Sequence, residues 1–163
     1  MKRKNHERVR FITLSATIAA LYVVLTLISA AFGLSSGVIQ IRISEALCVL
    51  TFFTSAAVPG LSIGCLIANT ITNAHILDIV FGTLATFLGA VGGRLLRKNP
   101  YLVSLPTVLA NMVIVPLVLV YGIGVRDVAL PIVSLSVGLG EFISASVLGT
   151  ALLFILKRYN FKF

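Results

Sequence analysis

The sequence has few charged residues. Asp, Glu, Lys and Arg together make up 11% of the 163 residues, whereas 58% are hydrophobic. The mean hydropathy is +1.08, which excludes an ordinary water-soluble domain. Because a membrane-spanning helix needs about 20 mostly apolar residues, six spans would use about 120 residues and leave only short loops and tails. The composition therefore predicts an all-α integral membrane protein without a soluble domain.

Several catalytic and metal-binding motifs are also missing. No GxxxxGK[ST] phosphate loop occurs, so any ATP hydrolysis must be carried out by a partner. There is no HExxH motif, and His75 has no second histidine or thiolate at ligand spacing. Cys48 and Cys65 lack CxxC spacing and are expected to be reduced, packed side chains. We therefore expect no enzyme activity, no metal and no cofactor.

The net charge is +8, and most of the 13 basic residues lie at the two ends of the chain and in one interior loop. They are Lys2, Arg3, Lys4, Arg8 and Arg10, then Arg94, Arg97 and Lys98, and finally Lys157, Arg158 and Lys162, whereas the other loops carry only Arg126 beside Asp127. This distribution is typical of cytoplasmic loops under the positive-inside rule, and it disfavours nucleic acid as a partner. Both termini are therefore expected in the cytoplasm, which requires an even number of crossings.

Six apolar blocks satisfy this parity within a single transmembrane domain. They cover residues 11–32, 37–53, 57–72, 76–96, 101–121 and 130–156. Residues 1–10 and 157–163 are then basic cytoplasmic tails around a six-helix bundle. The first block is longer than the apolar core of a secretory signal, so we expect it to remain as a helix.

The second block contains Gln40, Arg42 and Glu45. Charged groups in hydrocarbon are unfavourable, by about 2.5 to 3.5 kcal/mol on insertion scales, and usually face a protein interior or a wet cavity. Arg42 and Glu45 stand three residues apart, so on a helix they would share a face. Two interpretations remain open: a pair that merely neutralises itself, and a polar ligand pocket.

Other blocks also contain isolated polar residues. Asn69 lies in the third block, Asn111 near the middle of the fifth, and Glu141 well inside the sixth with no basic residue nearby in sequence. Glu141 must therefore find a donor on another helix, hold a ligand, or be protonated. Asp78, at the outer end of the fourth block, has three possible partners: a cationic ligand group, Arg42 or water. Pro116 is expected to kink the fifth helix.

Small residues at helical spacing mark two packing faces. Ala16 and Ala20 are four residues apart in the first block, and Gly82, Thr86, Gly89 and Gly93 form a stripe in the fourth. Small side chains allow close approach of another helix. The glycine stripe indicates packing within the bundle, whereas the alanine pair fits internal packing or a partner protein equally well.

Four separated motifs resemble the QueT family of queuosine-precursor transporters. They are IQIRISEAL (39–47), PGLSIGCLIAN (59–69), LDIVFGTLAT (77–86) and GLGEFISASVLG (138–149), and the resemblance extends over nearly the whole chain. Such proteins are the substrate-binding S components of energy-coupling factor (ECF) vitamin transporters. The resemblance implies a six-helix protein of the bacterial cell membrane, with a transmembrane coupling subunit (the T component) and two cytoplasmic ATPases as partners.

The ligand implied by the resemblance is a 7-deazaguanine base such as preQ0, preQ1 or queuine. Its guanine-like edge offers adjacent N–H donors, which a carboxylate accepts in bidentate fashion, beside a carbonyl oxygen that an amide can read. We expect Glu141 or Glu45 to bind the donor edge, and Asn69, Asn111 or Gln40 to bind the remaining polar atoms. Selectivity would come from buried polar groups that the wrong base leaves unpaired.

The resemblance also assigns supporting roles. Arg42 would orient Glu45, and Asp78 would meet the ammonium group of a ligand that carries one. Phe32, Phe81 and Tyr121 are candidates for covering the base.

Two further features match S components in general. Ala16 and Ala20 match the alanine face that docks on the coupling subunit, and residues 33–37 occupy the place of the loop that covers the ligand.

Two other functions remain open on the sequence alone. A stand-alone carrier driven by a proton gradient would use Glu141 as its proton relay and need no ATPase. A non-transporting membrane scaffold would use the polar residues only to lock helices together. The transport hypothesis would fail if a structure showed all of these groups tied to one another with no cavity between them.

Overall fold

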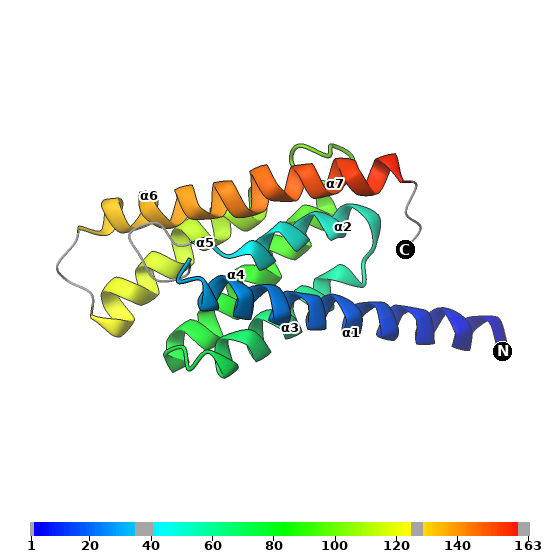
Figure 1. Cartoon of the computed structure of the whole chain (residues 1–163), viewed down its shortest axis with the longest axis horizontal. Coiled ribbons are helices and arrows are strands. Elements are labelled where there is room, and N and C mark those ends of the chain that lie inside the picture. Colours follow the sequence, from blue (N-terminus) through cyan, green and yellow to red (C-terminus); the bar gives the residue numbers. More distant parts are fainter. Residues whose placement is uncertain (1, 35–40, 125–128, 160–163) are drawn as a thin grey trace.

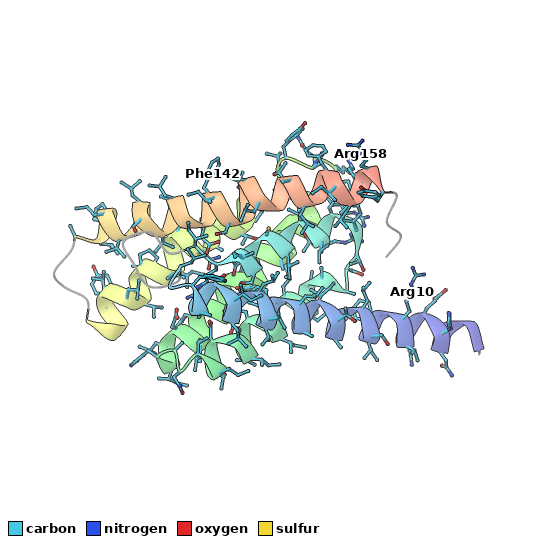
Figure 2. The ribbon with its side chains drawn as sticks, viewed as in Figure 1. Arg10, Phe142 and Arg158 are labelled. Atoms are coloured by element: carbon cyan, nitrogen blue, oxygen red, sulfur yellow. The ribbon has the colours of Figure 1, made fainter. Side chains whose placement is uncertain are left out.

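The structure, a computed structural model, describes residues 2–34, 41–124 and 129–159. This part of the chain is helical, without a strand. The helices lie roughly along a common direction, and the N-terminal end of α1 and the C-terminal end of α7 lie at the same end of the molecule (Figure 1). Arg10 and Arg158 also lie toward that end (Figure 2). This arrangement agrees with an even number of crossings.

Helix α1 (Lys2–Ala31) begins nine residues before the predicted block. The early start has a simple cause, because Lys, Arg and Glu are good helix formers and do not interrupt the helix. At 1.5 Å per residue the helix is about 45 Å long, against a hydrocarbon core of about 30 Å. The basic first turns therefore extend beyond the apolar layer as a continuation of the helix.

The second block forms a shorter helix than predicted. It consists of a 3₁₀ segment, η1 (Ile43–Val49), followed by the single α-helical turn α2 (Leu50–Phe53). Together they are about 20 Å long, too short to cross the hydrocarbon core alone. Every residue from Ser44 to Thr51 is buried within the protein. The apolar side chains of this segment therefore pack against other helices and do not face lipid.

Helices α3 (Ala57–Ile71) and α4 (Ile76–Leu95) agree with the third and fourth blocks within one residue. The turn between them contains Asn73 in the left-handed conformation, with φ 53°. Asparagine tolerates this conformation after a helix end. The His75 side chain then accepts a hydrogen bond from the backbone N–H of Leu77 at 3.3 Å and caps α4.

The last two blocks each contain a π-helical segment. The fifth begins at α5 (Leu105–Leu117) rather than at residue 101 and continues as the π-helix η2 (Val118–Ile123). Pro116 precedes η2, as expected of a residue that cannot donate the helical hydrogen bond. The sixth runs continuously through α6 (Leu130–Glu141), the π-helix η3 (Phe142–Leu148) and α7 (Gly149–Arg158).

Within the described residues, four helical stretches are long and apolar enough to cross a membrane. They are Asn5–Ala31, Ile76–Leu95, Leu105–Gly122 and Leu130–Arg158, whereas Ile43–Phe53 and Ala57–Ile71 are shorter apolar helices. The prediction of an all-helical, multi-pass membrane protein is thus confirmed. The prediction of six full crossings is not, because two of the six blocks form helices of less than membrane thickness.

Close helix packing depends on glycine at two interfaces. A Cβ atom at Gly64 of α3 would lie 2.7 Å from Tyr22 Cβ of α1, and one at Gly89 of α4 would lie 2.6 Å from Thr107 Cα of α5. Both distances are too short for any side chain, so the backbones approach as small-residue interfaces allow. The prediction that the α4 stripe packs within the bundle is confirmed, and the α1–α3 contact adds a second such interface.

The C-terminal end of α4 contacts the short helix α2 and fixes its position. Arg94 Nη1 donates hydrogen bonds to the carbonyl oxygens of Thr51 at 3.0 Å and Phe52 at 3.3 Å. The ammonium group of Lys157 lies over the Phe52 ring, 4.6 Å from its centroid. The Arg94 hydrogen bonds satisfy carbonyl groups at the end of α2, where a helix has no further backbone donors of its own. Together with the Lys157 contact they link α2 to α4 and α7.

Candidate ligand-binding site

Polar side chains from six segments of the chain meet inside the helical bundle. We call them the interior polar cluster: Tyr22 on α1, Arg42 and Glu45 around the start of η1, Asn69 on α3, Asp78 on α4, Asn111 on α5, and Glu141 on α6. Each of them except Arg42 and Asp78 is at most 8% exposed. The structure therefore brings together six of the seven predicted site residues and adds a tyrosine.

Arg42 pairs with Asp78 and does not share a helix face with Glu45. The Arg42 backbone is extended, with φ −107° and ψ 102°, because the residue precedes η1 instead of lying within a helix. Its Nη2 lies 3.7 Å from Asp78 Oδ2. The prediction of an Arg42–Glu45 pair on one helix face is thus wrong in its geometry. Among the three alternatives for Asp78, the pairing with Arg42 is confirmed.

Glu45 is held by α1. The hydroxyl group of Tyr22 donates a hydrogen bond to Glu45 Oε1, and both residues are buried. The sequence analysis missed Tyr22, although a tyrosine in the middle of a long apolar run is a usable signal, because a buried hydroxyl group needs a partner. This hydrogen bond fixes the Glu45 carboxyl group toward α1.

Asn69 contacts sulfur and lies close to Asp78. Its Nδ2 donates to Cys65 Sγ at 3.5 Å, and Thr86 Oγ1 donates to the same sulfur at 3.3 Å. A Cβ atom at Gly82 would lie 3.3 Å from Asn69 Nδ2 and 3.4 Å from Asp78 Oδ1. The absence of a side chain at Gly82 therefore lets the Asn69 amide group and the Asp78 carboxyl group approach the same face of α4.

Glu141 lies at a change of helix type. It is the last residue of α6, and the π-helix η3 begins at the next position. Such π-bulges are frequent at functional sites, because they alter the direction of a side chain. Glu141 lies near enough to interact electrostatically with Glu45 and Arg42, and its carboxyl group is within hydrogen-bonding reach of the Asn111 side chain. It thereby joins the α5–α6 side of the bundle to the Arg42–Glu45 segment.

Several buried polar atoms in this region have no partner. Among the described residues, the buried side-chain atoms without a hydrogen bond are Asp78 Oδ1, Thr83 Oγ1, Thr107 Oγ1, Asn111 Nδ2, Glu141 Oε2 and Ser144 Oγ. Unpaired buried polar groups are rare in native proteins and each one is unfavourable. The set includes both acceptors, the carboxylate oxygens, and a donor, the asparagine nitrogen. This set fits a polar ligand with donors and acceptors of its own.

Some predicted features lie elsewhere. Gln40 and most of the predicted covering loop, residues 33–37, lie outside the described residues. The side chains of Phe32, Phe81 and Tyr121 are 77%, 41% and 76% exposed, so the structure does not bury a ring from any of them against the cluster. Within the described ranges, no group of three or more His, Cys, Asp and Glu side chains is arranged to hold a metal ion.

Comparison with known proteins gives one family and one curated relative. Residues 12–158 match the model of a family described as "QueT transporter". The "Queuosine precursor transporter QueT" of Lactococcus lactis subsp. cremoris (strain MG1363) is 37% identical over 73 residues, which are 45% of this chain and 43% of that relative. The match therefore spans less than half of the relative's length. No solved structure matches the chain significantly.

Proposed function

Because the chain belongs to the QueT transporter family, we propose that it is the substrate-binding S component of an ECF importer in a bacterial cell membrane. Its ligand is a queuosine precursor, a 7-deazaguanine such as preQ0, preQ1 or queuine, captured from outside the cell. Two observations support this assignment: the curated relative is named as a transporter of queuosine precursors, and three of the buried polar atoms without a partner, Asp78 Oδ1, Asn111 Nδ2 and Glu141 Oε2, belong to the interior polar cluster.

The observation that carries the proposal is the neighbouring pair Glu141 and Asn111. Glu141 Oε2 and Asn111 Nδ2 are both buried without a hydrogen-bond partner in the described part of the chain. A 7-deazaguanine presents N–H donors next to a carbonyl oxygen. The carboxylate of Glu141 accepts from the donors and the amide nitrogen of Asn111 donates to the carbonyl oxygen, so one edge of the base satisfies both.

The other members of the cluster hold this site in shape. Tyr22 fixes Glu45, which leaves Glu141 as the carboxylate that is available to read the base. Buried polar groups then provide selectivity, because a ligand without the matching edge leaves Glu141 and Asn111 desolvated and unpaired. Binding of this kind requires no covalent chemistry.

Titration of the purified protein tests the ligand class directly. We expect preQ1 and queuine to bind, guanine to bind more weakly, and riboflavin to show no saturable binding, as measured by calorimetry in detergent or nanodiscs. Riboflavin is the control for a general affinity for flat heterocycles. Equal affinity for all four compounds, or no binding of any, would contradict the proposal.

Energy for import comes from partners in this proposal. The sequence contains no phosphate loop, and the proposed partners are a transmembrane coupling subunit and two cytoplasmic ATPases. Ala16 and Ala20 are exposed on α1, while the opposite side of that helix, with Ile18 and Tyr22, is buried against the bundle. An exposed face of small residues is suited to close contact with a helix of another subunit.

Larger side chains at Ala16 and Ala20 should weaken docking on the coupling subunit without changing ligand binding. We expect the double variant Ala16→Leu, Ala20→Leu to lose co-purification with the coupling subunit by about tenfold or more, because the bulky side chains prevent close approach of the helices. Ligand affinity should stay within about twofold, because neither alanine is in the cluster. Ala151→Leu, at an exposed alanine of α7, is the matched control. Retained co-purification of the double variant would show that this face is not the docking surface.

A further inference from the structure

A groove separates α1 from α7 at the end of the molecule where α1 begins and α7 ends (Figure 1). Both helices pack against η1 but hardly contact each other. Leu47 and Leu50, from η1 and α2, therefore form the floor of the groove, and Leu152 and Leu156 form its wall on α7. Its volume is about 570 Å³, within the range of about 300–1,000 Å³ for sites that hold a small molecule. We call it the α1–α7 groove.

The α1–α7 groove is apolar inside and open along α1. Leu47 and Leu50 are buried, being 6% and 4% exposed. Thr17 and Leu21 line the groove from α1 and are exposed. An empty groove of this kind would be unfavourable, because its lining would lose dispersion contacts on one side. Within a membrane the groove therefore needs an apolar occupant.

The length of the groove fits the lipid chains of one leaflet. Its lining follows α1 from Arg10 to Leu21, which is about 16 Å at 1.5 Å per residue. This is about half of the 30 Å hydrocarbon core. Arg10 directly precedes Phe11, where the apolar run of α1 begins, so the groove extends from the level of the lipid headgroups toward the midplane. A partner helix that crosses the membrane would instead use the whole thickness.

The mouth of the groove is basic. His6 and Arg10 line it, and none of the described lining residues is acidic. The Arg10 side chain lies on the side of α1 that faces α7 (Figure 2). Glu7, the single acidic residue of α1, lines a separate hollow together with Arg8. Basic pockets between membrane helices at this depth bind anionic lipid headgroups.

We propose that the α1–α7 groove is a binding site for an anionic phospholipid. The phosphate group lies at Arg10 and His6, and an acyl chain lies along the leucine floor. This site is separate from the interior polar cluster and does not depend on which solute the protein transports. It is also distinct from the proposed docking face, because neither Ala16 nor Ala20 lines the groove.

Comparison of matched lipids on the unmodified protein tests the proposal. The probes are phosphatidylglycerol and phosphatidylcholine with identical acyl chains, with binding measured by native mass spectrometry. We expect phosphatidylglycerol to bind at least about fivefold more tightly, since one basic side chain near the membrane surface contributes about this factor. Glycerol phosphate, which has the charge without the chains, should not compete. Equal affinity for the two lipids, or competition by glycerol phosphate, would overturn the proposal.

The variant Arg10→Gln locates the headgroup. We expect the affinity ratio of phosphatidylglycerol to phosphatidylcholine to fall to within about twofold, because the charge that favours the anionic lipid is gone. Arg8→Gln is the matched control, since it removes the same charge from the same helix outside the groove, and it should keep the ratio of the unmodified protein. Equal effects of the two variants would show a response to overall positive charge and would overturn the site.

The variant Thr17→Phe tests the apolar part of the groove. The ring should fill the space of the acyl chain and weaken binding of both lipids by at least about fivefold. Thr70→Phe is the control, because Thr17 and Thr70 are both exposed and each donates to the carbonyl oxygen four residues earlier in its helix. Unchanged lipid binding in Thr17→Phe would overturn the placement of the chain. Loss of co-purification with the coupling subunit in that case would show that a partner helix occupies the groove.

Discussion

Glu141→Gln is expected to weaken binding of a 7-deazaguanine by about 100-fold without destabilising the protein. The loss of affinity follows because the amide replaces one acceptor oxygen by a donor, which then faces the N–H groups of the base, and bonds to a charged group are worth about 1.5 to 3 kcal/mol. Stability should stay equal or rise, because Glu141 Oε2 has no partner in the described structure and a neutral side chain is easier to bury. Calorimetry and thermal unfolding in the same detergent measure the two effects.

The two readouts together distinguish a binding site from a scaffold. If Glu141 only locked helices together, the substitution would lower the melting temperature and leave ligand affinity unchanged. If Glu141 were the proton relay of a stand-alone carrier, uptake into proteoliposomes without any ATPase would depend on a pH gradient and stop in the variant. Glu7→Gln, at an exposed position of α1 outside the cluster, is the control for the effect of removing one negative charge on ligand affinity. A fall in stability without a fall in affinity would contradict the proposed role of Glu141.

Arg42→Gln is expected to destabilise the protein by about 3 kcal/mol or more, the range seen when one partner of a buried ion pair is removed. The structure gives the reason. Arg42 pairs with Asp78 and interacts electrostatically with Glu45 and Glu141. Removing it takes away the positive charge that these carboxyl groups share in the described part of the chain. Chemical unfolding in mixed micelles measures the change.

A matched pair of variants separates this effect from a general loss of charge. Arg97→Gln removes an arginine that is exposed beyond the end of α4, and surface changes of this kind are usually within about 0.5 kcal/mol. The double variant Arg42→Met, Asp78→Leu should recover much of the stability lost in Arg42→Gln, because no member of the ion pair is then left unpaired. Equal stability of Arg42→Gln and Arg97→Gln would contradict the central place of Arg42 in the cluster.

The sequence predicted the helical blocks well where apolar runs are long. The predicted ends of α3 and α4 are within one residue of the observed ones, because Pro, Asn and Gly near these ends stop a helix by local chemistry. It predicted the second block poorly. Hydropathy cannot distinguish a lipid-facing helix from one that is buried by protein, and η1 with α2 is of the second kind.

The sequence predicted which residues belong to the candidate site, but it did not predict which of them pair with one another. Rarity alone marks Glu45, Asn69, Asp78, Asn111 and Glu141, because polar groups in apolar runs need a reason. The pairing of Arg42 depends on one extended residue before η1, and local spacing favoured Glu45 over Asp78. A tyrosine inside a long apolar run indicates that Tyr22 needs a hydrogen-bond partner, but only the tertiary structure shows that this partner is Glu45.

By itself the sequence determined that this protein is a helical, multi-pass membrane protein and which side chains are too polar to face lipid. These properties follow from composition and from the distribution of positive charge along the chain, which are the same in any conformation. Only the tertiary structure decided that Arg42 pairs with Asp78, that Tyr22 holds Glu45, and that Glu141 and Asn111 lie next to each other, with Glu141 Oε2 and Asn111 Nδ2 among the described buried atoms that lack a partner. Hydrogen bonds and ion pairs depend on distances of a few ångströms between residues far apart in the chain, and helix packing sets those distances.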